Sequence, residues 1–129
     1  MADYLLDSNV LILHLRERPG ITALLTRWGK EGTLYISVVT RTELLAGMRP
    51  HEEARTIELL DSLENLPVDE AIADRAGRLI YQYARRGIQL SFADALIAAT
   101  ALEHGLTLAT TNPKHFPMPE LRLHPLDAK

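Results

Sequence analysis

The sequence predicts an α/β fold with a mainly parallel central sheet, and three observations support this prediction. Short apolar runs alternate with longer stretches of helical periodicity from one end of the chain to the other. Residues that favour turns and helix ends separate them, most clearly Pro19-Gly20, Gly87 and Gly105. The chain has 129 residues, which is the size of one compact domain and hardly more. We therefore expect a single domain over residues 1–129.

Five short segments are predicted as strands. Residues 33–38 form the strongest of them because most are β-branched, aromatic or aliphatic. Residues 66–68 include Pro67, which favours an edge strand or the start of a strand. The predicted strands, in chain order, are residues 4–6, 33–38, 66–68, 106–110 and 121–123.

Six segments show the apolar spacing of helices. The segment 91–104 is apolar nearly all round, which is typical of a buried helix. The amphipathic segment 51–65 is expected to turn four side chains toward the core: Ala54, Ile57, Leu60 and Leu63. The segment 69–86 is expected to bury Ile72, Ala76, Leu79, Ile80 and Tyr83. The predicted helices are residues 10–18, which Pro19-Gly20 would stop, then 21–30, 40–47, 51–65, 69–86 and 91–104.

Composition excludes several classes of function. The chain has no cysteine, so disulfides, thiolate zinc sites and a cysteine nucleophile are ruled out. Lys and Arg total 14 against 17 for Asp and Glu, and this net charge of −3 argues against binding nucleic acid by bulk positive charge. The start has no basic secretory region, and no apolar run approaches the roughly 20 residues of a membrane span. We therefore expect a cytoplasmic protein with no membrane segment.

Four polar residues are predicted at the carboxyl ends of the strands, where α/β proteins place their functional groups. Asp7 directly follows the first predicted strand, and Asn112 follows the fourth. Glu43 and Asp94 are expected in the first turns of the helices 40–47 and 91–104. The four side chains should therefore share one edge of the sheet.

Helix capping is the alternative interpretation of each of these residues taken alone. Thr40-x-x-Glu43 and Ser91-x-x-Asp94 both match the capping-box pattern. Asp7 is suited to cap the helix that follows it, and Asn112 before a proline is suited to a turn.

The set of three carboxylates points to a metal ion. Asp94 opens an apolar helix, where an ionised carboxylate needs a strong partner. Carboxylates that converge on one edge repel one another unless a cation lies between them. Oxygen ligands without cysteine favour Mg²⁺, with Mn²⁺ as the alternative, over zinc. Such an ion supports hydrolysis of phosphodiesters by activated water.

The chain resembles the PIN-domain ribonucleases, and most closely their VapC-type toxins. Four segments carry the resemblance in the same order: LLDSNVLI at residues 5–12, ISVVTRTEL at 36–44, DALIAATA at 94–101 and LATTNPKHF at 108–116. The resemblance covers essentially the whole chain. It implies a PIN-like three-layer α/β/α sandwich with a short, mainly parallel central sheet.

The resemblance also implies roles for particular residues. Asp7, Glu43 and Asp94 correspond to the metal-binding acids of the family, and Asn112 to a fourth catalytic position that is Asp in some members. Groups that contact the substrate or support these ligands are expected at Ser8, Asn9, Arg41, Thr110, Thr111 and Lys114. The alternative to a functional role is that these side chains form ordinary hydrogen bonds at helix caps and turns. For Arg41, the alternative is a side chain that faces solvent.

The sequence therefore predicts a Mg²⁺-dependent endoribonuclease, the toxin of a type II toxin–antitoxin pair. The resemblance implies an RNA substrate, a cognate VapB-type antitoxin and a homodimer, with contact surfaces expected on the helices 51–65 and 69–86. Two alternatives remain open. One is a structure-specific nuclease or metal-dependent phosphatase on a similar fold, and the other is a catalytically weak PIN-like binding module.

Overall fold

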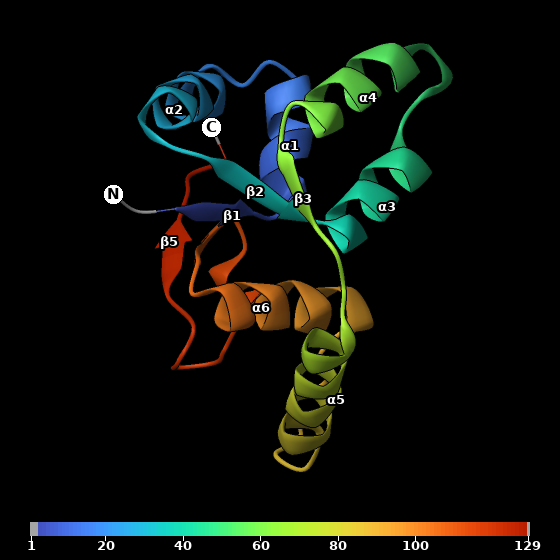
Figure 1. Cartoon of the computed structure of the whole chain (residues 1–129), viewed down its shortest axis with the longest axis vertical. Coiled ribbons are helices and arrows are strands. Elements are labelled where there is room, and N and C mark those ends of the chain that lie inside the picture. Colours follow the sequence, from blue (N-terminus) through green and yellow to red (C-terminus); the bar gives the residue numbers. More distant parts are fainter. Residues whose placement is uncertain (1–2, 129) are drawn as a thin grey trace.

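The structure, a computed structural model, describes residues 3–128 and contains a five-stranded sheet in the order β3-β2-β1-β4-β5 (Figure 1). Residues 1, 2 and 129 of the expected domain lie outside the described residues. Every pair of neighbouring strands is parallel, so the predicted α/β fold class is confirmed. The strands are β1 (Tyr4–Leu6), β2 (Leu34–Ser37), β3 (Glu64–Leu66), β4 (Thr107–Thr110) and β5 (Leu123–Pro125).

Helices cover both faces of the sheet. Figure 1 shows α1, α2 and α4 on one face and α6 with α5 on the other, which gives the three layers of the expected sandwich. None of the helices within residues 3–128 is both long enough and apolar enough to cross a membrane. The helices are α1 (Ser8–Leu15), α2 (Pro19–Glu31), α3 (Val38–Gly47), α4 (Glu53–Asp61), α5 (Glu70–Ala84) and α6 (Phe92–His104), with 3₁₀ turns η1 (Pro50–Glu52) and η2 (Pro113–His115).

Alternation along β1 divides the core between the two faces of the sheet. Leu5 packs with Ile97 of α6, whereas Leu6 packs in the cluster that contains Trp28 of α2. Both leucines are fully buried, and each such side chain contributes about 1.5–3 kcal/mol of hydrophobic stabilisation. The strand β1 is therefore fixed by packing on both faces of the sheet, and Asp7 is the first residue after it.

The predicted start of the third helix is wrong. The helix α3 begins at Val38, and the Ser37 hydroxyl caps it by accepting a 3.0 Å hydrogen bond from the Val39 amide. Thr40 is therefore an internal, fully buried residue, and the expected capping box between Thr40 and Glu43 is absent. Glu43 accordingly lies in the second turn of α3.

The expected stop signal at Pro19-Gly20 is also wrong. Pro19 is the first residue of α2, where its missing N–H costs nothing because the first amides of a helix have no partner within it. The preceding helix ends earlier, at Leu15, and Glu17 takes a positive φ of 59° in the short connection. A proline that follows a helix and one that opens the next helix look alike in the sequence.

The predicted helix 51–65 is shorter than expected and presents a different face. It comprises η1 and α4, and the chain then enters β3, which ends at Leu66 because Pro67 cannot donate to the ladder. Ala54 and Ile57 are exposed, contrary to expectation, while Thr56 and Leu60 are buried one helical turn apart. The other predicted elements are present, with β1 at the predicted residues and no end displaced by more than three residues.

Candidate functional site

Asp7 lies at the centre of a polar cluster on the carboxyl edge of the sheet. It follows β1 directly, caps α1, and is only 6% exposed. Its Oδ1 accepts a 2.8 Å hydrogen bond from the Ser8 amide, and its Oδ2 accepts a 2.8 Å hydrogen bond from the Thr110 hydroxyl at the end of β4. The ends of β1 and β4 lie side by side because the two strands are neighbours and parallel. The two hydrogen bonds therefore hold both carboxylate oxygens of Asp7 in place.

Burial raises the pKa of Asp7 above its ordinary value. The hydrogen bonds from Thr110 and Ser8 lower this pKa, the negative charge of Asp94 raises it, and His115 lowers it. Because desolvation is the largest of these effects, the ionised form of Asp7 is disfavoured unless a cation lies beside it. Asp94 affects Asp7 electrostatically, so the two carboxylates belong to one charged site.

Glu43 is connected to this site through Ser8. The Ser8 hydroxyl donates a 2.5 Å hydrogen bond to Glu43 Oε1, and the Ser8 amide donates to Asp7. Ser8 is buried, whereas Glu43 is exposed on α3. One small residue at the start of α1 therefore contacts two of the three predicted acids.

Asp94 lies in the first turn of α6, as predicted. The Ser91 hydroxyl accepts a 3.0 Å hydrogen bond from the Asp94 amide, so Ser91 caps the N-terminus of α6. Asp94 Oδ2 lies 3.6 Å from Nδ1 of His115, and its side chain is 25% exposed. The carboxylate is therefore accessible from solvent and lies beside His115 on η2.

Asn112 is positioned by the same threonine that contacts Asp7. Its amide donates a 2.9 Å hydrogen bond to the Thr110 hydroxyl, and the residue is half-buried at the start of η2. The Thr110 hydroxyl thus accepts from Asn112 while it donates to Asp7. Of the remaining candidates, Thr111 is half-buried on this edge, while Asn9 on α1 and Lys114 on η2 are exposed.

The donor chemistry at this edge suits a hard divalent cation, because Asp7, Glu43 and Asp94 all offer carboxylate oxygens. Within residues 3–128, no three acidic or histidine side chains lie close enough together to hold one metal ion as they stand. Glu43 is turned toward the Ser8 hydroxyl. Binding of one cation by all three acids would therefore require their side chains to move closer together.

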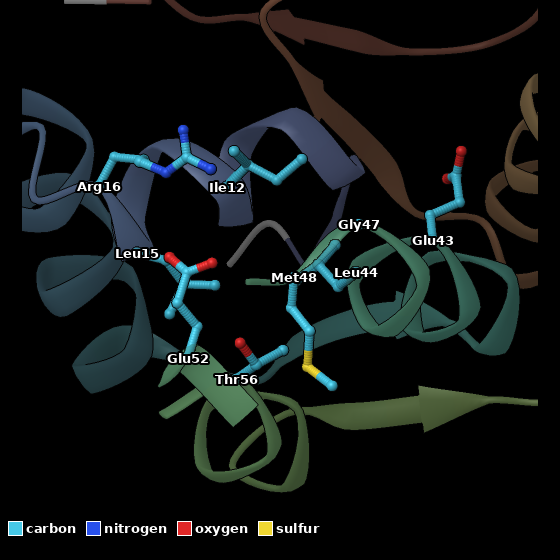
Figure 2. Close-up of a pocket in the computed structure, with 9 residues that line it drawn as sticks. All are labelled: Ile12, Leu15, Arg16, Glu43, Leu44, Gly47, Met48, Glu52 and Thr56. Atoms are coloured by element: carbon cyan, nitrogen blue, oxygen red, sulfur yellow. The ribbon is translucent and has the colours of Figure 1, made fainter. Parts of the chain in front are cut away.

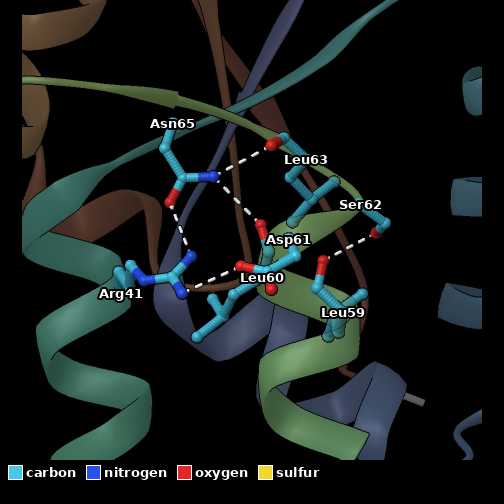
Figure 3. A network of polar contacts seen from close by, with 7 residues as sticks. All are labelled: Arg41, Leu59, Leu60, Asp61, Ser62, Leu63 and Asn65. Atoms are coloured by element: carbon cyan, nitrogen blue, oxygen red, sulfur yellow. Dashed lines mark hydrogen bonds and ion pairs between the residues drawn. The ribbon is translucent and has the colours of Figure 1, made fainter.

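Arg41 has partners away from this cluster (Figure 3). Its guanidinium forms a 2.9 Å ion pair with Asp61 and a 3.2 Å hydrogen bond to Asn65 Oδ1. The Asn65 side-chain amide in turn donates to the backbone carbonyls of Leu60 and Leu63. In this arrangement Arg41 connects α3 to the last residue of α4 and to β3.

A pocket beside Glu43 was not anticipated from the sequence (Figure 2). It has a volume of about 60 Å³ and lies between α1, α3, η1 and α4. Its lining residues are Ile12, Leu15, Arg16, Glu43, Leu44, Gly47, Met48, Glu52 and Thr56. No local signal could reveal it, because the walls come from segments that meet only in the folded chain.

Comparison with known proteins places the chain among toxin-like nucleases. The family model of the PIN domain matches residues 4–118. Ribonuclease VapC10 from Mycobacterium tuberculosis is 45% identical over 114 residues, which is 88% of this chain and 86% of that protein.

Solved structures agree with the sequence comparison. The crystal structure of VapBC2 from Rickettsia felis bound to a promoter DNA fragment matches with a TM-score of 0.86 and 25% identity, covering 97% of this chain and 99% of that chain. A toxin–antitoxin complex from Klebsiella pneumoniae matches with a TM-score of 0.77 and 32% identity, covering 92% and 94%. Each likeness covers more than nine-tenths of this chain.

Proposed function

Because this chain belongs to the PIN-domain family, as a nuclease of the VapC toxin type, we propose that it is a Mg²⁺-dependent endoribonuclease acting within a type II toxin–antitoxin pair. The observation that best supports the proposal is the buried Asp7 carboxylate. It is held by Thr110 and Ser8, and the charge of Asp94 acts on it. A buried acid beside a second acid, with its pKa raised by burial, is typical of a site that binds a cation.

Asp7, Glu43 and Asp94 would hold Mg²⁺, with Mn²⁺ as the alternative, and Asn112 would assist through its side-chain oxygen. A divalent cation at such a site supplies an activated water and neutralises the charge that develops on a phosphodiester. The oxygen-only donor set and the absence of cysteine from the chain both support this choice of metal.

The surrounding residues of this chain would fix the acids and the substrate. Thr110 holds one oxygen of Asp7, and the Ser8 amide holds the other. The exposed Lys114 and Asn9 and the half-buried Thr111 are suited to contact the RNA backbone near the acids. Positioning by such hydrogen bonds keeps a carboxylate in one orientation, which a metal ligand requires.

Cleavage of matched RNA and DNA tests the proposal. The purified chain should cut a labelled RNA with Mg²⁺ and leave the DNA of the same sequence intact, and chelation should stop the reaction. Asp94→Asn should abolish cleavage, whereas Asp74→Asn, an exposed acid on α5, should leave it unchanged.

The other outcomes support the alternatives. Cutting of structured DNA would indicate a structure-specific nuclease, and release of inorganic phosphate from monoesters would indicate a phosphatase. Absence of turnover with either metal would indicate a binding module.

A VapB-type antitoxin is the proposed protein partner, because the similar structure from K. pneumoniae is a toxin–antitoxin complex. The product of a short reading frame next to this one should copurify with the chain and inhibit RNA cleavage. Separate elution of the two proteins and full activity of their mixture would contradict this partner.

A homodimer is proposed through the connection between α5 and α6. Phe92 is 75% exposed and Tyr81 is 61% exposed, and Ile88 lies between them in the sequence with 37% of its surface exposed. Ile88 and Phe92 line one surface pocket, and exposed apolar side chains that lie together are typical of an interface. Phe92→Glu should convert a dimer into a monomer in analytical ultracentrifugation. A wild-type chain that sediments as a monomer at all concentrations would contradict the proposal.

A further inference from the structure

The pocket beside Glu43 shares a side chain with the acidic cluster. Glu43 lines the pocket and also accepts the hydrogen bond from Ser8, whose amide contacts Asp7. Figure 2 shows Glu43 at one side of the pocket and Arg16 at the other, with Thr56 and Glu52 along the wall formed by η1 and α4. A ligand in the pocket would therefore lie next to the proposed site of phosphodiester hydrolysis.

Thr56 carries an unsatisfied hydroxyl at this pocket. The residue is 1% exposed, and its Oγ1 has no hydrogen-bond partner. In Figure 2 the hydroxyl oxygen is directed toward the pocket and Glu52. A buried hydroxyl without a partner carries a desolvation cost of about 1–3 kcal/mol, which a ligand able to donate or accept a hydrogen bond would remove.

The walls of the pocket combine apolar and complementary polar groups. Ile12, Leu44 and Met48 provide apolar surface, and the unbranched Met48 side chain adapts easily to a flat ligand. Arg16 adds a guanidinium, and Glu52 adds a carboxylate that the Arg49 amide fixes through a 2.7 Å hydrogen bond. The pocket thus offers an exposed cation, a fixed anion and a hydroxyl beside apolar surface.

We propose that this pocket receives the edge of one unstacked base of the RNA substrate, next to the phosphodiester that the acidic cluster cleaves. The inference rests on the proposed function and extends it to base specificity. A base has apolar faces and an edge that carries both donors and acceptors, which matches the mixed walls here. An aliphatic side chain of a protein partner would leave the Thr56 hydroxyl and the Arg16 guanidinium without partners, so the observations favour a base.

The conservative variant Thr56→Val tests the inference because it removes the hydroxyl and keeps the volume. Thr40→Val is the matched control, since Thr40 also has a buried hydroxyl without a partner but does not line the pocket. A pool of single-stranded RNAs of random sequence is cleaved by each protein, and the new ends are sequenced. Thr56→Val should weaken the preference for one base near the cut by about tenfold, and Thr40→Val should retain it.

Arg16→Gln provides a second variant on the opposite wall and should also change the base preference. Identical cleavage patterns for wild type, Thr56→Val and Arg16→Gln would overturn the inference. Variants that lose affinity only for the antitoxin would overturn it as well, because the pocket would then serve a protein partner.

Binding of nucleoside 5′-monophosphates keeps this test separate from the test of the proposed function. Nuclear magnetic resonance follows the methyl groups of Thr56 and Met48 during titration with each of the four nucleotides and with ribose 5-phosphate. Saturable shifts for one base above the others, lost in Arg16→Gln, would support the pocket even if the chain cleaved no RNA. Equal responses to all four nucleotides and to ribose 5-phosphate would overturn it.

Discussion

The Thr110 hydroxyl donates a 2.8 Å hydrogen bond to Asp7 Oδ2, and so joins the carboxyl ends of two neighbouring strands through side chains 103 positions apart. The same oxygen accepts a 2.9 Å hydrogen bond from the Asn112 amide, which fixes the direction of the hydroxyl proton toward Asp7. Thr110 is fully buried, so solvent cannot replace either bond. The position of the most buried acid of the site therefore depends on Thr110.

Replacing Thr110 by valine should lower RNA cleavage. The variant keeps the shape of the side chain and removes both hydrogen bonds, which leaves Asp7 Oδ2 free to rotate. Residues that support a metal ligand typically change activity by about 10–100-fold, and kcat/KM should fall within that range. Thr110→Ser restores the hydroxyl and should retain most activity. Equal activities of the valine and serine variants would contradict a positioning role.

Replacing Asp7 by asparagine should stabilise the metal-free chain at neutral pH. Burial raises the pKa of Asp7, so the folded state binds this proton more tightly than the unfolded state does. The free energy of unfolding therefore falls as pH rises from 3.8 through the raised pKa, and the variant avoids this loss. Urea unfolding in chelator measures the difference, which should vanish in acid. A variant less stable than wild type at neutral pH would contradict this account.

His14 should make the chain less stable below about pH 6.5. Burial lowers the pKa of His14, and the nearby charge of Arg55 lowers it further, so the folded state binds this proton less readily than the unfolded state. Stability from this residue is complete above the unfolded pKa of 6.5 and is lost as pH falls from there through the lowered pKa of the folded state. Thermal unfolding of His14→Gln should depend less on pH in this range. An unchanged pH dependence would contradict the effect.

Replacing Gly77 by alanine should stabilise α5. Gly77 is exposed within this helix, and an added Cβ would meet no atom within 4 Å. Alanine is favoured over glycine inside a helix by about 1 kcal/mol. Chemical denaturation should detect this gain, while RNA cleavage stays at the wild-type rate because α5 carries none of the three predicted metal-binding acids. Gly105→Ala is the contrasting control, since a φ of 64° at that position opposes alanine.

The order of the elements could be predicted from the sequence, but several of their ends could not. Apolar runs and helical spacing identify the strands and helices because those patterns are set by burial on the sheet. Ser37 and Thr40 are both good capping residues, and only the pairing of Ser37 with Leu66 at the end of the ladder selects Ser37. The exposed face of α4 likewise depends on which helix packs against it, and this is a property of the tertiary structure.

The candidate site was also predictable only in part. Asp7 could be placed because it directly follows a buried strand, and Asp94 because Ser91 marks the start of α6. The hydrogen bonds from Thr110 to Asp7 and from Ser8 to Glu43 join residues distant in the sequence, so their geometry required the folded chain. The contact between His115 and Asp94 and the pocket at Thr56 have the same origin.

Parallel measurement of Mg²⁺ binding and RNA cleavage tests the central claim most directly. Mg²⁺ is titrated into the wild type and Asp94→Asn, with binding followed by calorimetry and cleavage followed on one labelled RNA under the same conditions. We predict that binding and cleavage saturate together in the wild type and that both are lost in Asp94→Asn, whose circular dichroism stays native. Full cleavage by the wild type in chelator, or wild-type binding and cleavage by Asp94→Asn, would contradict the claim.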